Sequence, residues 1–532
     1  MPAWSRPRSL LSLSLLSALL LVGACHKTTS GEPKRPGKAK VDKQAKQVVL
    51  PDPLALPAQP KAASWIADPQ RGLGLLTPYS PMPVEMRGLA QLALGTVTEP
   101  ALAEQLAGVI DPARPFANVV LDGGDEVIRL SVAPDQAEQL KTILANLESA
   151  GEFGAVQLPP ALSDNPQRAG HEWLAWIDQE DEGALVLSNS LPGLVTGRHL
   201  AAAYGSEPIF FTIDPGSLPI PVEIPFSRIE AHGDFSKVAV TAVAREGQDP
   251  LAGVPIQAGT LGGLLEGKGV VAGASTRYAD HEEAVRQVIV EVNAQVAELP
   301  FLVRGVGEDL AAKLNTTLRT WDGRVLVAMG PRGHLRIAYG AKDPTKSRVA
   351  MLRLLQTVVD NVSVARSFVS NLPRLTLRRR VATGGGQDVE MFVIGDAAAN
   401  LPRELRALTD GEGRLNIAMS WAPHAGGGQF VIGPNADKEL AAWLEETKDS
   451  PSAEQTQGDL LAASFAADPQ QLQAVLANFQ PGQEPDQAAI MAALLGLDAS
   501  GPRWGLQAKT TEPGHYELVI TPPASKPPRA KH

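Results

Sequence analysis

The chain has 532 residues, of which 44% are hydrophobic, 20% charged and 5% aromatic, and its formal net charge is −10. This apolar content excludes a chain that is disordered throughout, and a single short apolar run excludes a protein with several membrane spans. At roughly 100–200 residues per domain, the length predicts two or three domains, each large enough to bury a hydrophobic core.

Residues 1–24 have the features of a secretory signal peptide. Arg6 and Arg8 precede an apolar and small-residue run from Leu10 to Ala24, which is too short to cross a bilayer comfortably. We therefore expect the chain to be exported.

The end of this run resembles the lipobox of bacterial lipoproteins. Val22, Gly23, Ala24 and Cys25 place a branched apolar residue three positions before a cysteine, with small residues between them. The resemblance covers the first 26 residues or so, and it implies cleavage before Cys25, diacylglycerol on Cys25 and a new amine open to acylation. Two or three acyl chains form a stable membrane anchor. His26 stands where an Asp commonly retains lipoproteins in the inner membrane, so the resemblance implies the outer membrane.

Cys25 is the only cysteine of the chain. Without a second thiol the chain forms no internal disulfide, so the fold must depend on hydrophobic burial. Cysteine-based zinc sites and cysteine catalysis are excluded for the same reason.

Charge divides the remaining chain into three parts. Residues 25–61 form a Pro- and Lys-rich segment with a net charge of +5, which we expect to be a disordered tether. Residues 526–532 form a disordered basic tail. The part between them, residues 62–525, has a net charge of −20, which excludes nucleic acid as a partner and predicts repulsion from a bare anionic membrane.

A hairpin followed by a helix occurs in both halves of this acidic part. Phe116 to Val132 predicts two strands and a turn, and Pro134 to Ala150 has apolar residues at helical spacing. Arg324 to Tyr339 predicts a second such hairpin, and Thr345 to Leu372 predicts a long amphipathic helix. The two halves therefore follow the same order of elements.

Two glycine-rich segments give the closest internal repeat. Gly384–Gln387 and Gly426–Gln429 each precede an apolar strand, and helices are predicted next at Leu401–Thr409 and Ala436–Thr447. Because a hairpin with a helix is a common unit, a chance similarity is the alternative to a repeat.

We expect an α+β protein with two similar lobes, residues 62–245 and 321–525. Each lobe is predicted to be a mostly antiparallel, twisted sheet with helices on one face, and both end in alternating strands. Residues 246–320 are predicted to be a helical connecting segment, with consecutive helices at Asp280–Leu299 and Val303–Leu318.

One segment has the glycine spacing of a phosphate-binding loop. It runs from Gly262 to Lys268, but Gly269 stands where such loops carry the Ser or Thr that ligates magnesium, and no clear apolar strand leads into it. A flexible glycine-rich loop is therefore favoured, and we expect no bound nucleotide.

An acidic segment has part of the spacing of a calcium loop. Asp178, Glu180 and Glu182 match its first positions, but Asn189 replaces the closing Glu, so the segment is interpreted as an acidic hairpin tip. Just before it, Trp173 and Trp176 are three residues apart. On a strand they lie on opposite faces, so we expect one in the core and the other exposed or covered by a helix.

Sequence motifs for catalysis or metal binding are scarce. No two of the nine histidines lie within five residues of each other, which excludes the His-x-x-x-His zinc signature. The densest polar cluster, Asp280 to Glu283, is interpreted as the start of a helix, where acidic side chains favour the positive end of the dipole. We predict no metal and no cofactor.

Two functions remain. The first is a membrane-anchored envelope lipoprotein without catalytic activity, which binds an apolar ligand such as lipid, a polymer or a protein partner. The second is an extracytoplasmic hydrolase that acts on peptides or glycans with a site assembled from distant segments. The first is favoured, because Cys25 is the only residue with a specific functional signal.

Overall fold

The computed structural model describes residues 50–523, apart from residues 57–59, 77–85, 122, 151–152, 161–171, 179–182, 218–224, 249–253, 255, 266–269, 370–371, 423–425, 450–457, 467, 469–500 and 513. The chain divides into two compact units, Met1–Gln248 and Asp249–His532. Helices and antiparallel strands are present in both, which confirms the α+β class.

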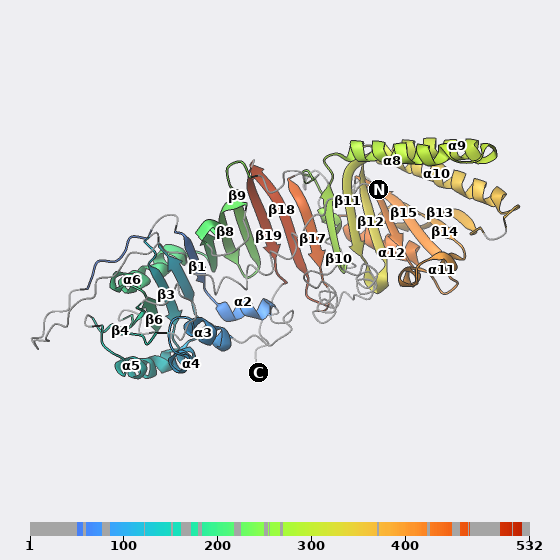
Figure 1. Cartoon of the computed structure of the whole chain (residues 1–532). Helices are drawn as coiled ribbons and strands as arrows, with labels where there is room; N and C mark the ends of the chain where they lie inside the picture. Colours follow the sequence, from blue (N-terminus) through green and yellow to red (C-terminus); the bar gives the residue numbers. More distant parts are fainter. Residues whose placement is uncertain are drawn as a thin grey trace, which may run out of the picture. The chain divides into compact units, whose positions relative to one another are not determined.

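In the first unit the described strands pair in the order β4–β5–β6–β3–β2–β1–β7–β8–β9, each antiparallel to its neighbour (Figure 1). β1 therefore lies between β2 and β7, although a helical segment separates it from β2 in the chain. The elements are β1 Ala62–Ile66, α2 Pro69–Leu76, α3 Met86–Leu94, α4 Pro100–Val109, β2 Phe116–Val120, β3 Glu126–Ser131, η2 Pro134–Gln136, α5 Ala137–Ala145, β4 Val156–Gln157, β5 Leu174–Ile177, β6 Ala184–Ser188, α6 Leu191–Thr196, η3 Gly197–His199, α7 Leu200–Tyr204, β7 Ile209–Ile213, η4 Pro215–Ser217, β8 Phe226–Asp234 and β9 Lys237–Ala244.

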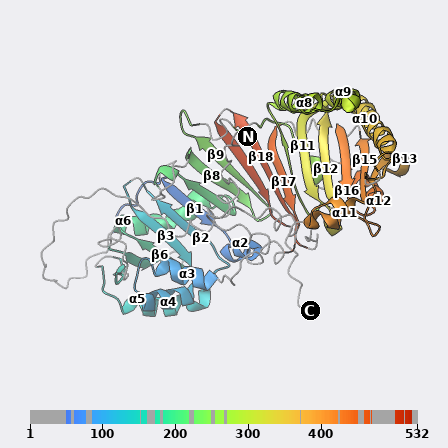
Figure 2. The same ribbon diagram turned by 45° about the vertical axis from the view of Figure 1, so that its right-hand side comes forward.

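Helices cover both faces of this sheet, so the expectation of helices on one face is wrong (Figure 2). Leu185 of β6 packs in one cluster with Leu106 of α4 and Leu140 of α5. Its neighbour Val186 packs in another cluster with Leu194 of α6. Successive residues of a strand point to opposite faces, and β6 is apolar on both, so each face needs a cover of helices.

In the second unit the described strands pair in the order β13–β14–β15–β16–β12–β11–β10–β17–β18–β19, again antiparallel throughout. The elements are η5 Gly262–Leu265, β10 Ala272–Arg277, α8 His281–Ala297, α9 Phe301–Leu318, β11 Trp321–Met329, η6 Pro331–Gly333, β12 Leu335–Ala341, α10 Pro344–Ala365, β13 Leu375–Gly384, β14 Gln387–Ile394, α11 Ala397–Asn400, η7 Arg403–Leu408, β15 Leu415–Ala422, β16 Gly427–Ile432, α12 Ala436–Thr447, β17 Asp459–Phe465, β18 Trp504–Glu512 and β19 His515–Thr521.

The second sheet also has helices on both faces. Met419 of β15 packs with Leu352 of α10, whereas the adjacent Ala418 packs with Trp443 of α12. The expectation of helices on one face fails here for the same reason, because the inner strands are apolar on both sides.

The predicted helices of the connecting segment belong to the second unit. α8 and α9 form an antiparallel pair, and α9 packs along α10 (Figure 1). β10, just before α8, pairs with β11 and β17 inside the sheet. Its residues are small or polar, so no apolar pattern predicts a strand there.

The first glycine-rich segment forms the predicted turn before a strand, whereas in the second only Gly426 lies in a turn and residues 427–429 already belong to β16. Gly385 and Gly386 have φ of 53° and 74° and connect β13 to β14, as the two central residues of a tight hairpin require. A Cβ on Gly384 would lie 2.3 Å from the carbonyl oxygen of Ala441 in α12, so the helix packs directly on this hairpin. Gly426, with φ of 63°, precedes β16, and the helix predicted after that strand is α12.

Candidate functional site

Several residues of the sequence interpretation lie outside the described residues. These are Cys25 and its neighbours, Lys268, Glu180 and Glu182. The tether and the tail are also outside, except for residues 50–56, 60 and 61.

The segment with phosphate-loop spacing does not begin as a flexible loop. Gly262–Leu265 is a buried 3₁₀ turn, and the core cluster under α12 includes Leu264 and Leu265. The next described element is the strand β10, whereas a phosphate-binding loop leads into a helix whose N-terminus faces the phosphate. This order of elements differs from that of a phosphate-binding loop.

Trp173 and Trp176 lie on opposite faces of the first sheet, as predicted, and both are buried under helices. Trp173 packs in the cluster of α4 and α5, and Trp176 packs in the cluster of α6 and α7. Neither is available for stacking on a ligand.

Asp178 is the centre of a buried charged cluster. It is only 3% exposed, and its carboxylate lies 2.9 Å from Nη1 of Arg129 and 3.3 Å from Nε of Arg198. The Arg198 guanidinium also lies over the ring of Trp176, 4.6 Å from the ring centre. The sequence matches Asp178 to the first position of a calcium loop. In the structure its carboxylate instead faces two arginines, which hold it inside the fold.

The second unit has a buried arginine on β12, Arg336, which is 1% exposed. Its Nη2 lies 3.8 Å from Glu439 of α12, and its guanidinium lies over Trp443. Burial lowers the pKa of Arg336, although the nearby Glu446 and Glu439 partly oppose this effect. In the sequence, Arg129 and Arg336 are each recognisable only as a single Arg inside an apolar strand.

A hydrogen-bonded network of neutral side chains lies beneath α10. The Tyr339 hydroxyl is 2.7 Å from Oγ of Ser347 and accepts a bond from Nε1 of Trp421 at 3.1 Å. Thr320 donates to the same Ser347 oxygen at 3.1 Å. Burial raises the pKa of Tyr339. Ser347 is fully buried, so the network holds α10 on the sheet.

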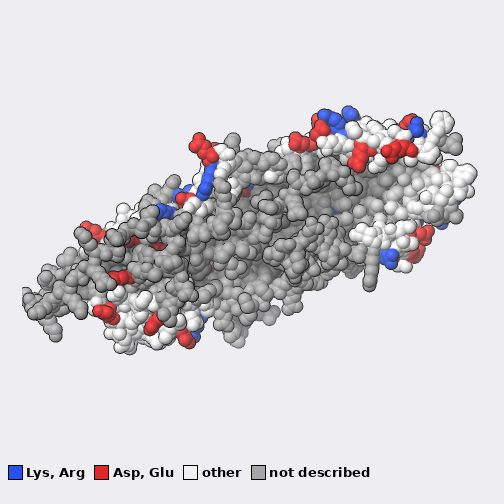
Figure 3. All heavy atoms as spheres, viewed as in Figure 1, with Lys and Arg blue, Asp and Glu red and all other residues white. Residues whose placement is uncertain are grey.

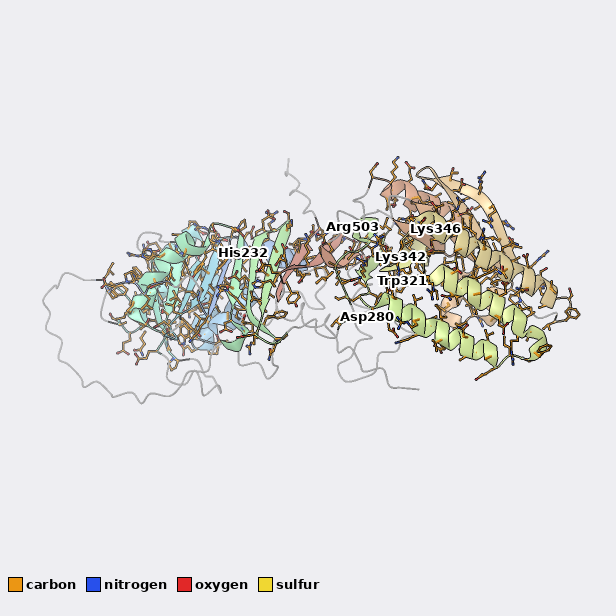
Figure 4. All side chains as sticks on the ribbon, turned by 90° about the horizontal axis from the view of Figure 1, so that it is seen from above. His232, Asp280, Trp321, Lys342, Lys346 and Arg503 are labelled. Atoms are coloured by element: carbon orange, nitrogen blue, oxygen red, sulfur yellow. The ribbon has the colours of Figure 1, made fainter. Side chains whose placement is uncertain are left out.

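The polar cluster Asp280–Glu283 lies where α8 begins, as predicted, with Glu282 and Glu283 in the first turn of the helix. Glu282 accepts a bond of 2.7 Å from Lys342, and this bond lowers the pKa of Glu282. Figure 4 shows Asp280, Lys342 and Trp321 close together at this end of the unit. An exposed ion pair of this kind joins two elements and adds little stability.

His232 of β8 lies between two carboxylates of the first unit, 3.6 Å from Glu207 and 3.8 Å from Glu230 (Figure 4). Glu230 also receives bonds from Arg228 and Thr212. Among the described residues, no group of three or more His, Cys, Asp or Glu side chains has an arrangement that could hold a metal ion.

A hollow of about 380 Å³ lies between α3 and α4. Small and polar residues line it: Gly88, Gln91, Gly95, Thr96, Pro100 and Ala103. It lies between two helices of the first unit, and the described residues that line it are uncharged.

The most exposed large apolar side chains are in the helical layer of the second unit. Phe301 at the start of α9 and Phe368 just after α10 are each 85% exposed, and Val364 is 64% exposed. Within the described part of the chain, none of the helices combines the length and the apolar content that crossing a membrane requires.

Comparison with known proteins gives no relative. No protein family, no curated protein and no solved structure matches this chain.

Asp410, before β15, gives a prediction about acid stability. Burial alone would raise the pKa of Asp410, but bonds from the Arg414 backbone and from the side chains of Asn416 and Arg414 lower it to about 2. The usual value is 3.8. The folded state therefore binds this proton less readily than the unfolded state, and the stability contributed by Asp410 is lost as the pH falls from about 4 to 2.

We expect Asp410→Asn to flatten the dependence of Tm on pH between about pH 4 and pH 2. Thermal unfolding followed by circular dichroism over this range measures the slope. Asp360→Asn removes one charge from the surface of α10 and serves as the control. Identical slopes for Asp410→Asn and the unchanged chain would contradict the prediction.

Proposed function

We propose that this chain is a cell-envelope lipoprotein, anchored in the membrane by acyl chains on Cys25, that has a binding or structural role without catalysis. The observation that carries the proposal is the sequence Val22–Cys25 at the end of a signal-like apolar run. The outer membrane is the proposed location, because His26 follows the cysteine in place of Asp. The proposed partners are an apolar ligand or another envelope protein.

The distribution of charged groups in the described residues supports a role without catalysis. Asp178 is held by Arg129 and Arg198, and the buried Glu390 is bonded to Arg348. A general acid or base must reach a substrate from a cleft, whereas these carboxylates face arginines inside the fold.

We further propose that the two units are lobes of the same type. Their strand orders correspond. β1 lies between β2 and β7, and β10 lies between β11 and β17. In the same way, β6 is the neighbour of β3, and β16 is the neighbour of β12. In the first unit α5 comes after β3 and α6 after β6. In the second unit α10 comes after β12 and α12 after β16.

The buried arginines support the same correspondence. Arg129 pairs across the sheet with an alanine of β2 and a valine of β6, and Arg336 pairs with an alanine of β11 and a valine of β16. Each unit also has an arginine over a buried tryptophan. A shared position for a costly buried charge favours a duplicated unit over a chance similarity of common motifs.

The anchor is tested by Cys25→Ala. We expect this variant to lose all incorporation of labelled fatty acid and to keep its signal peptide, because the thioether that precedes cleavage cannot form. The measurements are acyl labelling in growing cells and mass spectrometry of the N-terminal peptide. Ser30→Ala, five residues later, is the control and should remain fully lipidated.

Acyl label that persists in Cys25→Ala would refute the anchor. The binding role is tested separately by native mass spectrometry of the lipidated protein purified from its own envelope. A stoichiometric extra lipid or small molecule would make the protein a carrier, and a copurified protein would make it a scaffold. A hydrolytic activity in a screen of peptides and glycans would overturn the role without catalysis.

A further inference from the structure

One segment of the acidic chain contains only positive charge. Residues 361–387 have five arginines and neither Asp nor Glu: Arg366, Arg374, Arg378, Arg379 and Arg380. Arg380 forms an ion pair of 3.1 Å with Asp388. The other four arginines form no ion pair in the described structure, and Arg374, Arg378 and Arg379 are exposed. The segment therefore presents unneutralised positive charge.

Large apolar side chains are exposed within the same segment. Val364, Phe368 and Val369 are 64%, 85% and 47% exposed. They follow the part of α10 that packs on the sheet, where Leu352 and Val359 contribute to the core. A cluster of exposed apolar residues is unusual on a soluble surface and marks a site of interaction. Edge protection by charge could account for the arginines of β13, but it does not account for an exposed phenylalanine.

A second exposed phenylalanine lies at a neighbouring helix end. Phe301 starts α9, which runs along α10, and it is also 85% exposed. Figures 1 and 4 place the α8–α9 turn and the end of α10 at the same end of the second unit. In Figure 3 uncharged residues cover most of the surface there.

We infer that the end of α10, with the exposed Val364, Phe368 and Val369, and the adjoining edge strand β13, with the arginines that form no ion pair in the described structure, dock on an anionic lipid surface; we call this region the α10–β13 surface. Basic and apolar residues together are the signature of proteins that lie at the interface of such a membrane. Charge complementarity favours this occupant over a neutral surface, and each arginine near an anionic bilayer raises partitioning by about fivefold. Because the rest of the folded part is acidic, repulsion would turn other faces away and so select this orientation.

The inference is independent of acylation and can be tested without it. The chain carrying Cys25→Ser has no thiol, so a cysteine introduced at position 367 or 202 can be labelled alone with an environment-sensitive fluorophore. Ser367→Cys lies next to Phe368, and Ala202→Cys lies on the exposed side of α7 in the first unit. Both are measured with vesicles of phosphatidylcholine alone and of phosphatidylcholine with phosphatidylglycerol.

We expect a blue shift and quenching by lipid-borne quenchers for the probe at 367, with anionic vesicles only, and no change at 202. Phe368→Ser and the pair Arg378→Glu with Arg379→Glu should each reduce the apparent affinity at least tenfold. The pair Arg87→Glu with Lys438→Glu, both exposed, changes the net charge equally and should have little effect.

Equal signals at positions 367 and 202 would overturn the inference, because the α10–β13 surface would then have no preference for lipid. The apolar residues 10–24 would be enough to hold the chain on the vesicle. An unchanged affinity after the arginine replacements would also overturn it. A positive result stands even if Cys25 proves not to be acylated, and a negative result leaves the anchor intact.

Discussion

Replacing Asp178 with alanine is expected to lower the free energy of unfolding of the first unit by about 3–5 kcal/mol, because it removes a buried carboxylate that partners two largely buried arginines. The carboxylate lies 2.9 Å from Arg129 and 3.3 Å from Arg198, and both arginines are largely buried. Without Asp178 these two like charges face each other over the apolar core of α6 and α7. Deprotonation cannot relieve the cost, since arginine stays charged.

Hydrogen exchange followed by mass spectrometry measures this effect in each unit separately. We expect faster exchange in β3 and β5, together with an unchanged rate in β11 and β12 of the second unit. Glu138→Gln, which removes a surface ion pair with Lys141, is the control and should change stability by less than about 1 kcal/mol. Exchange in β3 at the original rate would show that the cluster contributes little.

Replacing Trp443 with alanine is expected to cost the second unit about 3–5 kcal/mol. Trp443 is fully buried on α12, donates a bond to the carbonyl of Leu264, and packs against the strands with Leu440 and Leu444. Its ring also covers the guanidinium of Arg336. The variant would therefore create a cavity and remove the aromatic neighbour of a buried charge.

Two variants separate these contributions. Trp443→Phe keeps most of the volume but loses the bond to Leu264, and we expect it to cost less than the alanine variant. Phe301→Ala truncates an exposed aromatic residue and should change stability by about 0.5 kcal/mol or less. Urea unfolding, monitored by hydrogen exchange of the β15 amides, ranks the variants by their loss of stability. A cost for Phe301→Ala equal to that for Trp443→Ala would contradict the role of burial.

Local periodicity made much of the secondary structure predictable. The hairpin expected over residues 116–132 is β2 and β3, and the long helix expected from Thr345 begins at Pro344 and ends at Ala365. The helix expected at Ala436–Thr447 has those bounds. Each depends on apolar spacing within a single segment, which is a local property of the sequence.

Long-range arrangement was not predictable in the same way. The insertion of β1 between β2 and β7 joins segments far apart in the chain, and neither propensity nor spacing records such pairing. The second layer of helices was missed because a continuous apolar strand such as β6 does not say which elements cover it. The partners of Asp178 were missed because Arg198 lies on a separate turn.

The sites show the same division. The lipidation of Cys25 is proposed from four adjacent residues, whereas the α10–β13 surface depends on exposure, which a sequence alone does not reveal. Phe368 lies within the helix predicted over Thr345 to Leu372, whereas the structure ends α10 at Ala365 and leaves Phe368 85% exposed.

The position of β1 and β10 within their sheets has a consequence for the order in which the chain can fold. A side-chain bond joins Thr276 of β10 to Leu460 of β17, 184 residues later, and another joins Leu54 to Thr196, 142 residues later. Loop closure over such distances is slow, so neither sheet can be completed until most of its unit has been synthesised. For the exported chain that we propose, this delay would keep the nascent protein open until translocation is well advanced.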